Sequence, residues 1–261
     1  METPTAKALI SVKDLVARYG DLVVLDSVSF DVFGGEILVI MGGSGCGKST
    51  LLRHMIGLEQ PHAGTVLIEG TDLTACSDTE FKRILRKIGV LFQGSALFGS
   101  MTVAENVAVP LRAYSGLPKD AIDSLVRIKL QIVGLDGYGS FLPSELSGGM
   151  KKRAGLARAL AMSPGIVFLD EPSAGLDPVT SAEIDDLILH INASIGTTMV
   201  IVTHELASIF TVASRVIMLD RRARGIIAEG DPRRLRETTR NTYVKQFFNR
   251  QAKPDPMPKD L

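Results

Sequence analysis

A glycine-rich segment between a predicted strand and a predicted helix constrains this chain more than any other feature. Residues 36–41 before it are a largely apolar run of strand length, and residues 49–57 after it read as a helix that ends at Gly57. The segment has the pattern G-x-x-x-x-G-K-[ST], which in this strand–helix context is typical of a phosphate-binding loop. Its residues, with the one that follows, are Gly42, Gly43, Ser44, Gly45, Cys46, Gly47, Lys48, Ser49 and Thr50. We expect all of them to contact a nucleotide.

The chemistry of this segment follows from its residue types. Glycines let successive backbone N–H groups face phosphate oxygens, and the following helix adds the positive end of its dipole. Lys48 is predicted to bring a point charge to the β- and γ-phosphates, and Ser49 a hydroxyl to Mg²⁺. A flexible glycine turn without a ligand is the alternative interpretation.

A second glycine-rich run, Leu146-Ser147-Gly148-Gly149-Met150, begins another predicted helix. The first turn of a helix has unpaired N–H donors, which together with the Ser147 hydroxyl suit a γ-phosphate. An ordinary helix cap is the alternative. A chain with two separate phosphate-facing elements suggests that each binds a different copy of the nucleotide, so ATP is expected between two subunits.

Two carboxylates follow an apolar strand at residues 166–169. Asp170 is predicted to hold Mg²⁺ through water, because this ion dehydrates reluctantly. Glu171 is predicted to polarise the attacking water as a general base. Taken alone, such a pair also fits a solvated strand end.

Three polar or aromatic side chains complete the predicted site. His204 follows the strand at residues 199–202 and is expected to hydrogen-bond the γ-phosphate. Gln93 ends the strand at residues 88–92, where it is expected to contact Mg²⁺ or water. Tyr19 is a candidate for stacking on adenine. Each of them also fits a purely structural strand-end residue.

The order of elements predicts an α/β fold. The expected core is a mostly parallel sheet flanked by helices, with an antiparallel β subdomain and an inserted α-helical subdomain at about residues 94–163. Residues 1–240 are expected to form a single domain, with a C-terminal extension at 241–261 whose last part, 251–261, is extended or disordered. The predicted strands are 9–16, 23–32, 36–41, 65–69, 88–92, 166–169, 199–202 and 216–219, the last a candidate antiparallel edge.

Composition excludes several classes of protein. Lys and Arg together number 29, as do Asp and Glu, so the chain lacks the basic balance of a nucleic-acid binder. Its two cysteines have no metal-type spacing, which favours a reducing, cytosolic compartment. No apolar run approaches the length of a membrane span. Any membrane role is therefore expected to come through a partner.

In order and spacing these motifs resemble the nucleotide-binding subunit of an ATP-binding-cassette (ABC) transporter over about residues 9–235. The resemblance implies a P-loop NTPase of the ABC ATPase fold that closes as a head-to-tail homodimer on ATP. The phosphate loop, Gln93, Asp170-Glu171 and His204 would act in one subunit while Ser147-Gly148-Gly149 reaches the other nucleotide. Asp177 would lie at the dimer seam.

The resemblance also implies a membrane partner. A short cytoplasmic helix of an integral membrane permease would sit in a cleft near Gln93. Leu97, Phe98 and Met101 are candidate contacts for it, and core packing is the alternative for each of them. The protein would then be cytoplasmic and peripheral, held on the cytoplasmic face of the inner (plasma) membrane by its permease.

Met150 departs from the family, which usually has Gln at that place. The form Gly-Gly-Met-x-[Lys/Arg]-Arg resembles the ATPases of Mce-type lipid transporters such as MlaF. That branch implies phospholipid cargo, a lipid-binding Mce-type protein and a small STAS-like regulatory protein. Its C-terminal extension, here containing Tyr243, Phe247 and Phe248, would grip the neighbouring subunit; packing on its own subunit is the alternative.

Other function classes remain as alternatives. An importer ATPase for amino acids or another polar solute is the nearest. Soluble cassette proteins of translation or DNA repair usually carry two cassettes or a long coiled-coil insertion, and neither pattern is present. A regulatory module that does not hydrolyse ATP would have little use for both Glu171 and His204.

Overall fold

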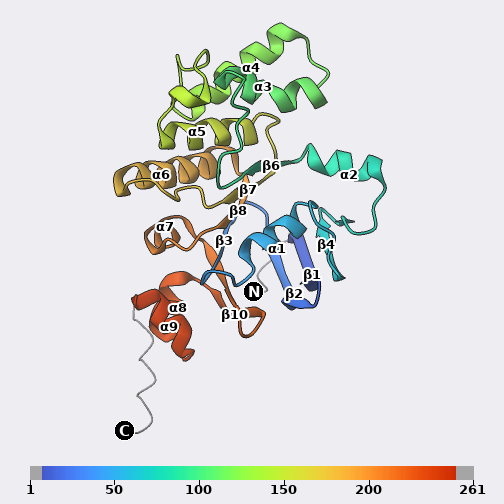
Figure 1. Ribbon diagram of the computed structural model, residues 1–261, viewed down its shortest axis with the longest axis vertical. Coiled ribbons are helices and arrows are strands. Elements are labelled where there is room, and N and C mark those ends of the chain that lie inside the picture. Colours follow the sequence, from blue (N-terminus) through green and yellow to red (C-terminus); the bar gives the residue numbers. More distant parts are fainter. Residues whose placement is uncertain (1–7, 251–261) are drawn as a thin grey trace, which may run out of the picture.

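Two β-sheets form the centre of the computed structural model, which describes residues 8–250 (Figure 1). The smaller sheet has the strand order β2-β1-β4-β5 and is antiparallel. Its strands are β1 (Ala8–Tyr19), β2 (Leu22–Phe33), β4 (Ala63–Ile68) and β5 (Thr71–Asp72). This sheet is the predicted antiparallel β subdomain.

The larger sheet has the order β10-β9-β3-β8-β7-β6. Its strands are β3 (Ile37–Gly42), β6 (Ile88–Leu91), β7 (Ile166–Asp170), β8 (Thr198–Val202), β9 (Arg215–Asp220) and β10 (Gly225–Gly230). All neighbours pair in parallel except β9 and β10. Every residue of β3 and β8 is buried, as expected for parallel strands covered on both faces.

The prediction that residues 216–219 form an antiparallel edge was wrong. They belong to β9, which lies inside the sheet and pairs in parallel with β3. Four consecutive apolar residues of β9 are fully buried, so this strand needs cover on both faces. The antiparallel edge is β10, which is mostly half-buried.

Helices cover both sheets, and side chains cap the starts of several of them. Helices α2 and α3 begin with capping boxes, in which Ser77 and Thr102 are the N-caps. The helices are α1 (Lys48–Met55), α2 (Asp78–Leu85), α3 (Val103–Tyr114), α4 (Lys119–Ile132), α5 (Gly148–Ala159), α6 (Pro178–Ile195), α7 (Leu206–Val212), α8 (Pro232–Thr238) and α9 (Thr242–Asn249), with a 3₁₀ turn η1 (Pro143–Glu145). Across residues 8–250, none of the helices combines the length and apolarity needed to cross a membrane.

The parallel sheet separates two hydrophobic cores. Val39 and Met41 of β3 point to one face, where they pack in a cluster that includes α3, α4, α5 and α6. Leu38 and Ile40 point to the other face, toward α1 and the antiparallel sheet. Helices α3, α4 and α5 form a helical lobe inserted between β6 and β7, at the top of Figure 1.

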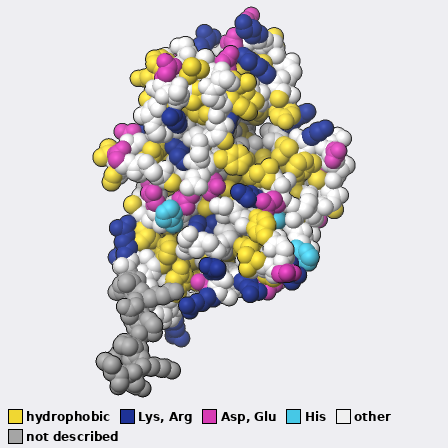
Figure 2. Space-filling model, in the orientation of Figure 1, with side chains coloured by type: hydrophobic (Ala, Val, Ile, Leu, Met, Phe, Trp, Pro, Cys, Tyr) yellow, Lys and Arg dark blue, Asp and Glu magenta, His cyan; other side chains and the backbone are white. Residues whose placement is uncertain are grey.

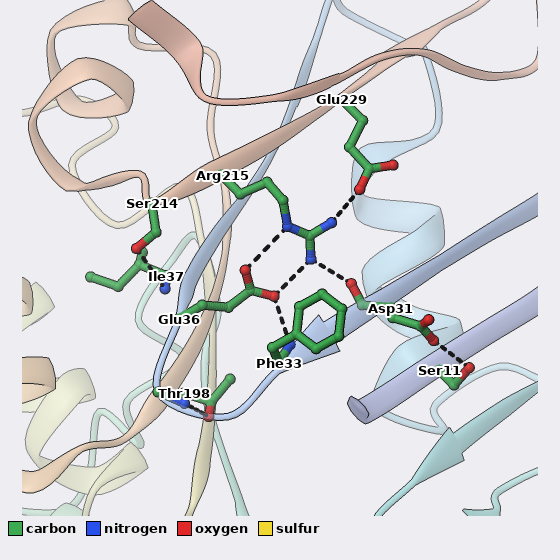
Figure 3. Close-up of polar contacts among 10 residues, drawn as sticks. Ser11, Asp31, Phe33, Glu36, Ile37, Thr198, Ser214, Arg215 and Glu229 are labelled. Carbon is green, nitrogen blue, oxygen red and sulfur yellow. Dashed lines mark hydrogen bonds and ion pairs between the residues drawn. The ribbon is translucent and has the colours of Figure 1, made fainter. Parts of the chain in front are cut away.

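Arg215 at the start of β9 ties the two sheets together (Figure 3). Its guanidinium pairs with Glu36 (Nη2–Oε1 2.7 Å), donates to the carbonyl of Asp31 (2.6 Å) and bonds Glu229. It also lies over the Phe33 ring, with Cζ 5.3 Å from the centroid. These contacts hold the ends of β3 and β9 that are opposite the phosphate loop.

Helix α9 packs on its own chain. Val244 is fully buried and Phe248 is 3% exposed within the core, where the Phe248 ring lies 5.6 Å from that of Phe210. Phe247 is partly buried beside it. In the structure Phe247 and Phe248 thus pack on their own subunit, which was the alternative interpretation for them. The predicted extended segment 251–261 lies outside the described residues.

Candidate active site

The phosphate loop connects β3 to α1, and its glycines adopt conformations that other residues avoid. Gly45 and Gly47 have φ of 71° and 100°. At Gly42 (φ 146°) a Cβ would lie 2.4 Å from the carbonyl oxygen of Leu219. Helix α1 begins at Lys48 with no side chain capping its first N–H groups. The loop therefore suits an anion such as a phosphate group.

Lys48 folds back over this loop. Its ammonium donates to the carbonyls of Gly42 (3.0 Å) and Gly43 (3.1 Å), so the charge is held at the mouth of the loop. Ser49 is exposed, as a hydroxyl that binds a metal from solvent must be. Cys46 faces inward at 2% exposure, and burial raises the pKa of its thiol.

Tyr243 of α9 closes the loop from the side. A Cβ at Gly43 would lie 2.7 Å from the Tyr243 hydroxyl oxygen, so the phenol occupies the space that a side chain at this place would fill. The C-terminal helix is thus in contact with the nucleotide-binding loop. Sequence patterns did not indicate this contact, because it joins residues 200 positions apart.

We expect Gly43→Ala to lower the stability of the protein, because its methyl group would overlap the Tyr243 hydroxyl. The cost should be roughly 1 kcal/mol, at the low end for overpacking since the hydroxyl can shift. In a Tyr243→Phe background the oxygen is gone and the same substitution should cost much less. Unfolding free energies of the four proteins in this cycle test the contact. An equal loss in both backgrounds would show that the methyl meets something else.

Asp170 and Glu171 lie at the carboxyl end of β7, where side chains from adjacent parallel strands meet. Glu171 is 8% exposed, and its Oε1 is 2.7 Å from Nδ1 of His204 beyond β8. Burial raises the pKa of Asp170, and the neighbouring Glu171 charge adds to this. Glu171 and His204, two of the predicted catalytic groups, are thus in direct contact.

Oxygen atoms at this place suit a hard cation and water. Within the described residues, Oδ1 of Asp170 and Oε2 of Glu171 are buried without a hydrogen-bond partner. Mg²⁺ takes few protein carboxylates and completes its shell with phosphates and water. The residues therefore fit Mg²⁺ bound together with a nucleotide.

The backbone at Glu171 is strained. Its φ is 48°, in the left-handed region that a residue with a long side chain rarely adopts. Its N–H donates to the carbonyl of Val202 at 2.8 Å, which anchors it to β8. Such strain persists only where the surroundings impose it, and it is common at functional sites.

Gln93 follows β6 and is exposed at the edge of the helical lobe. Lys152 of α5 donates to the backbone carbonyls of both Gln93 and Glu171, the latter at 2.8 Å. The structure thus joins two predicted site residues through a third that the motif pattern had not assigned a role. The only sequence signal was its place in the run after Met150.

Ser147, Gly148 and Gly149 lie apart from these groups. Ser147 caps α5 by accepting from the N–H of Met150 (3.3 Å), so the helix-cap interpretation holds for its hydroxyl. Within the described residues, no hydrogen bond joins this segment to the phosphate loop or to Glu171. Ser147 and Gly148 are exposed, whereas Gly149 is buried because α5 packs there against Thr180 of α6.

Asp177 and Tyr19 are both exposed. Asp177 caps α6 by accepting from the N–H groups of Val179 and Thr180, each at 3.0 Å. The hydroxyl of Tyr19 donates to Glu59 (2.6 Å), and this bond lowers the pKa of Glu59. The roles of Asp177 at a dimer seam and of Tyr19 against adenine stay predictions.

An apolar cavity of about 510 Å³ opens between α2, β6 and the helical lobe. Figure 2 shows hydrophobic side chains gathered in the hollow below that lobe. Phe98, 50% exposed, lines it beneath the Arg158 guanidinium, 6.0 Å from Cζ to the ring centroid. Leu97 packs partly into the core instead. Phe98 is therefore the better placed of these two candidates for contact with a partner.

Asp185 is a buried carboxyl that the sequence had not indicated. It lies on α6, is 4% exposed and has an Oδ1 without a hydrogen-bond partner in the described residues. Burial raises its pKa to about 6, although a hydrogen bond from Ser208 acts in the opposite direction.

We expect Asp185→Asn to stabilise the protein at neutral pH but not near pH 4. Below about pH 4 the carboxyl is protonated in both the folded and unfolded states, so it costs nothing. As pH rises through about 6 the folded state loses stability, up to about 3 kcal/mol, because the charge is buried. Unfolding free energies at pH 4 and 7.5 measure the effect. Exposed Asp123→Asn on α4 is the matched control. If the difference in unfolding free energy between Asp185→Asn and wild type does not change with pH, the prediction is contradicted.

Comparison with known proteins identifies a matching family and several relatives of this chain. A family model described as ABC transporter matches residues 25–174. The probable ribonucleotide transport ATP-binding protein mkl of Mycobacterium leprae is 44% identical over 240 residues, covering 92% of this chain and 68% of its own length. The methionine import ATP-binding protein MetN of Brucella abortus is 41% identical over 228 residues, with 87% and 61% covered. The chain thus spans about two thirds or less of the length of these relatives.

Solved structures agree with this assignment. The dimeric post-hydrolysis state of the ATP-binding cassette MJ0796, bound to ADP and Pi, superposes with a TM-score of 0.77 at 31% identity, covering 85% of this chain and 98% of the other. CbiO1 from Clostridium perfringens, part of the ABC transporter complex cbiONQ, gives 0.79 at 29% identity, with 87% and 90% covered. The predicted ABC ATPase fold is confirmed, as are ATP hydrolysis and the use of ATP with Mg²⁺ that define these cassettes. The chain belongs to the ABC transporter family, as one of its ATP-hydrolysing cassettes.

Proposed function

We propose that this chain is the ATPase subunit of a membrane transporter and acts as a head-to-tail dimer. The observation that carries the proposal is the buried Glu171 carboxylate bonded to His204 beside an open phosphate loop. The exposed Ser147-Gly148 turn, apart from that loop in its own chain, is available to a nucleotide held by a second copy. The likeness to a dimeric cassette with ADP and Pi supports this arrangement.

Each site residue has a chemical task in this proposal. Lys48 and the N–H groups of the loop bind the phosphates, while Ser49, Asp170 and Gln93 hold Mg²⁺. The metal, when bound, offsets the negative charge of the phosphate oxygens. Glu171 orients the attacking water and accepts its proton.

His204 orients Glu171 and faces the phosphate. Because its Nδ1 is bonded to Glu171, Nε2 remains as the ring atom for the γ-phosphate, to which it can donate when both ring nitrogens carry a proton. The side chain is 60% exposed, so it is accessible to a nucleotide entering from solvent. This arrangement is that of a base and its positioning partner.

We place the permease at the apolar cavity between α2 and the helical lobe. The cavity borders β6 just before Gln93, so a helix seated there lies next to a residue of the site. This partner would hold the protein at the cytoplasmic face of the inner membrane. A permease helix in this cavity would cover the Phe98 ring, which is exposed in the structure.

For the cargo we propose phospholipid or another hydrophobic lipid. The support is the resemblance of the Met150–Arg153 segment to Mce-type ATPases, which brings an Mce-type lipid-binding protein and a STAS-like regulator as expected partners. The names of the mkl and MetN relatives favour a second candidate, the uptake of a polar solute such as a ribonucleotide or methionine.

Purification of the chain with its permease in mild detergent separates these candidates. We expect co-purifying phospholipid, and ATPase activity of the complex in vesicles that rises with added phospholipid. Glu171→Gln in the same complex is the control for hydrolysis by this subunit. If methionine or a ribonucleotide with a soluble receptor stimulates the ATPase activity and lipid does not, the cargo is a polar solute and not a lipid.

A further inference from the structure

Lys152 places a buried ammonium group between two segments of the site. It lies in the second turn of α5, and the residue is 6% exposed. Its Nζ donates to the backbone carbonyls of Gln93 and Glu171, which are 59 and 19 positions away in the sequence. A single side chain of the helical lobe thus reaches the segments that follow β6 and β7.

The surroundings of this ammonium explain why it stays in place. Burial lowers the pKa of Lys152, and the nearby Asp170 and Glu171 carboxylates act in the opposite direction. A buried cation is costly unless it is hydrogen-bonded, and the two carbonyls meet that need. Burial of the ammonium has a cost that a surface lysine would avoid, and these hydrogen bonds offset it.

The Glu171 end of this contact supports a strained peptide. Glu171 has a left-handed φ of 48°, and its carbonyl also accepts from the N–H of Ala174 at 3.3 Å. The shorter bond to its carbonyl comes from Lys152, at 2.8 Å. This bond helps to hold the backbone from which the Glu171 carboxylate reaches His204.

The Gln93 end of the contact lies in a segment that packs against α5. Arg158, on the same helix, donates to the carbonyls of Ser95 (2.8 Å) and Ala96 (2.7 Å). A Cβ at Gly155 would lie 2.6 Å from Leu91 Cδ1, so α5 lies tightly against this segment. Helix α5 and residues 91–96 therefore form one packed unit.

We propose that Lys152 is a positioning residue for ATP hydrolysis, coupling the placement of α5 to that of the Glu171 carboxylate. The inference rests on the proposed role of Glu171 as the base. Helix α5 begins at the turn that would meet the second nucleotide, so closure of the dimer would act on Glu171 through this ammonium. The effect is on the rate of hydrolysis and not on the binding of ATP.

Steady-state ATPase kinetics of the full chain test this role. For Lys152→Met we expect kcat to fall about 30-fold, the size of a lost hydrogen bond to a charged group, with KM for ATP nearly unchanged. Lys152→Gln keeps N–H donors on a shorter side chain and should fall in between. Lys151→Met is the matched control: for its ammonium the described part of the chain provides no hydrogen bond, and kcat should stay at the wild-type value.

The outcomes separate this inference from the proposed role of Glu171. If Glu171→Gln stops turnover while Lys152→Met keeps the wild-type kcat, Lys152 has no positioning role and Glu171 keeps its own. Normal turnover in Glu171→Gln would instead exclude Glu171 as the general base. Thermal unfolding and ATP binding report on folding. If Lys152→Met does not fold, Lys152→Gln decides, because full kcat in that variant overturns the inference and a lowered kcat at unchanged KM supports it.

Discussion

Replacing Glu171 by Gln is expected to lower kcat for ATP hydrolysis by about 10²–10⁴-fold, the usual contribution of a positioned general base. The amide keeps the size of the side chain and an oxygen that can accept from His204, but it cannot take a proton from water. ATP binding should be unaffected, since Glu171 is predicted to act on water and not on the phosphates. Phosphate release and equilibrium ATP binding measure the two effects separately.

This variant should also trap the closed dimer. If hydrolysis opens the dimer, blocked hydrolysis should let an ATP-bound pair accumulate, which light scattering detects. Glu183→Gln is the matched control, because Glu183 is an exposed partner of Arg153 (2.9 Å) away from the site. Normal turnover in Glu171→Gln would exclude Glu171 as the base.

Replacing Lys48 by Ala should weaken ATP binding by at least about 10-fold. Each charge-assisted hydrogen bond that is lost is worth about 1.5–3 kcal/mol, and a factor of ten corresponds to about 1.4 kcal/mol. The loop also loses the side chain that spans the carbonyls of Gly42 and Gly43. Equilibrium titration with ATP and Mg²⁺ measures the dissociation constant.

A thermal shift gives an independent check on this variant. ATP should raise the Tm of the wild-type protein, since a ligand that binds the folded state stabilises it, and it should raise that of Lys48→Ala much less. Lys87→Ala is a suitable control, because Lys87 pairs with Glu69 on the surface. Unchanged affinity and turnover in Lys48→Ala would show that the phosphates bind elsewhere.

Much of the secondary structure was predictable because it depends on local signals. Apolar runs of four to six residues mark β3, β7 and β8, and side-chain caps mark the starts of α2, α3 and α6. The direction of β9 was not predictable in this way. A buried apolar strand looks the same in sequence whichever way it runs, and only the crossover through α7 makes β9 parallel to β3.

The site was predictable where one motif supplies both the residue and its geometry. The phosphate loop is such a case, because its glycine conformations and its lysine are all within eight residues. Glu171 and His204 were predicted separately, and their contact depends on the parallel pairing of β7 with β8.

By itself the sequence determined that this chain has a phosphate loop, a carboxylate pair after a buried strand and a second glycine-rich turn, because these are runs of neighbouring residues. Only the tertiary structure decided that Lys152 joins Gln93 to Glu171, that Tyr243 fills the space beside Gly43, and that Asp185 is buried. The physical reason is distance along the chain. Contacts between residues tens to hundreds of positions apart depend on how sheets and helices pack, and no local pattern records that packing.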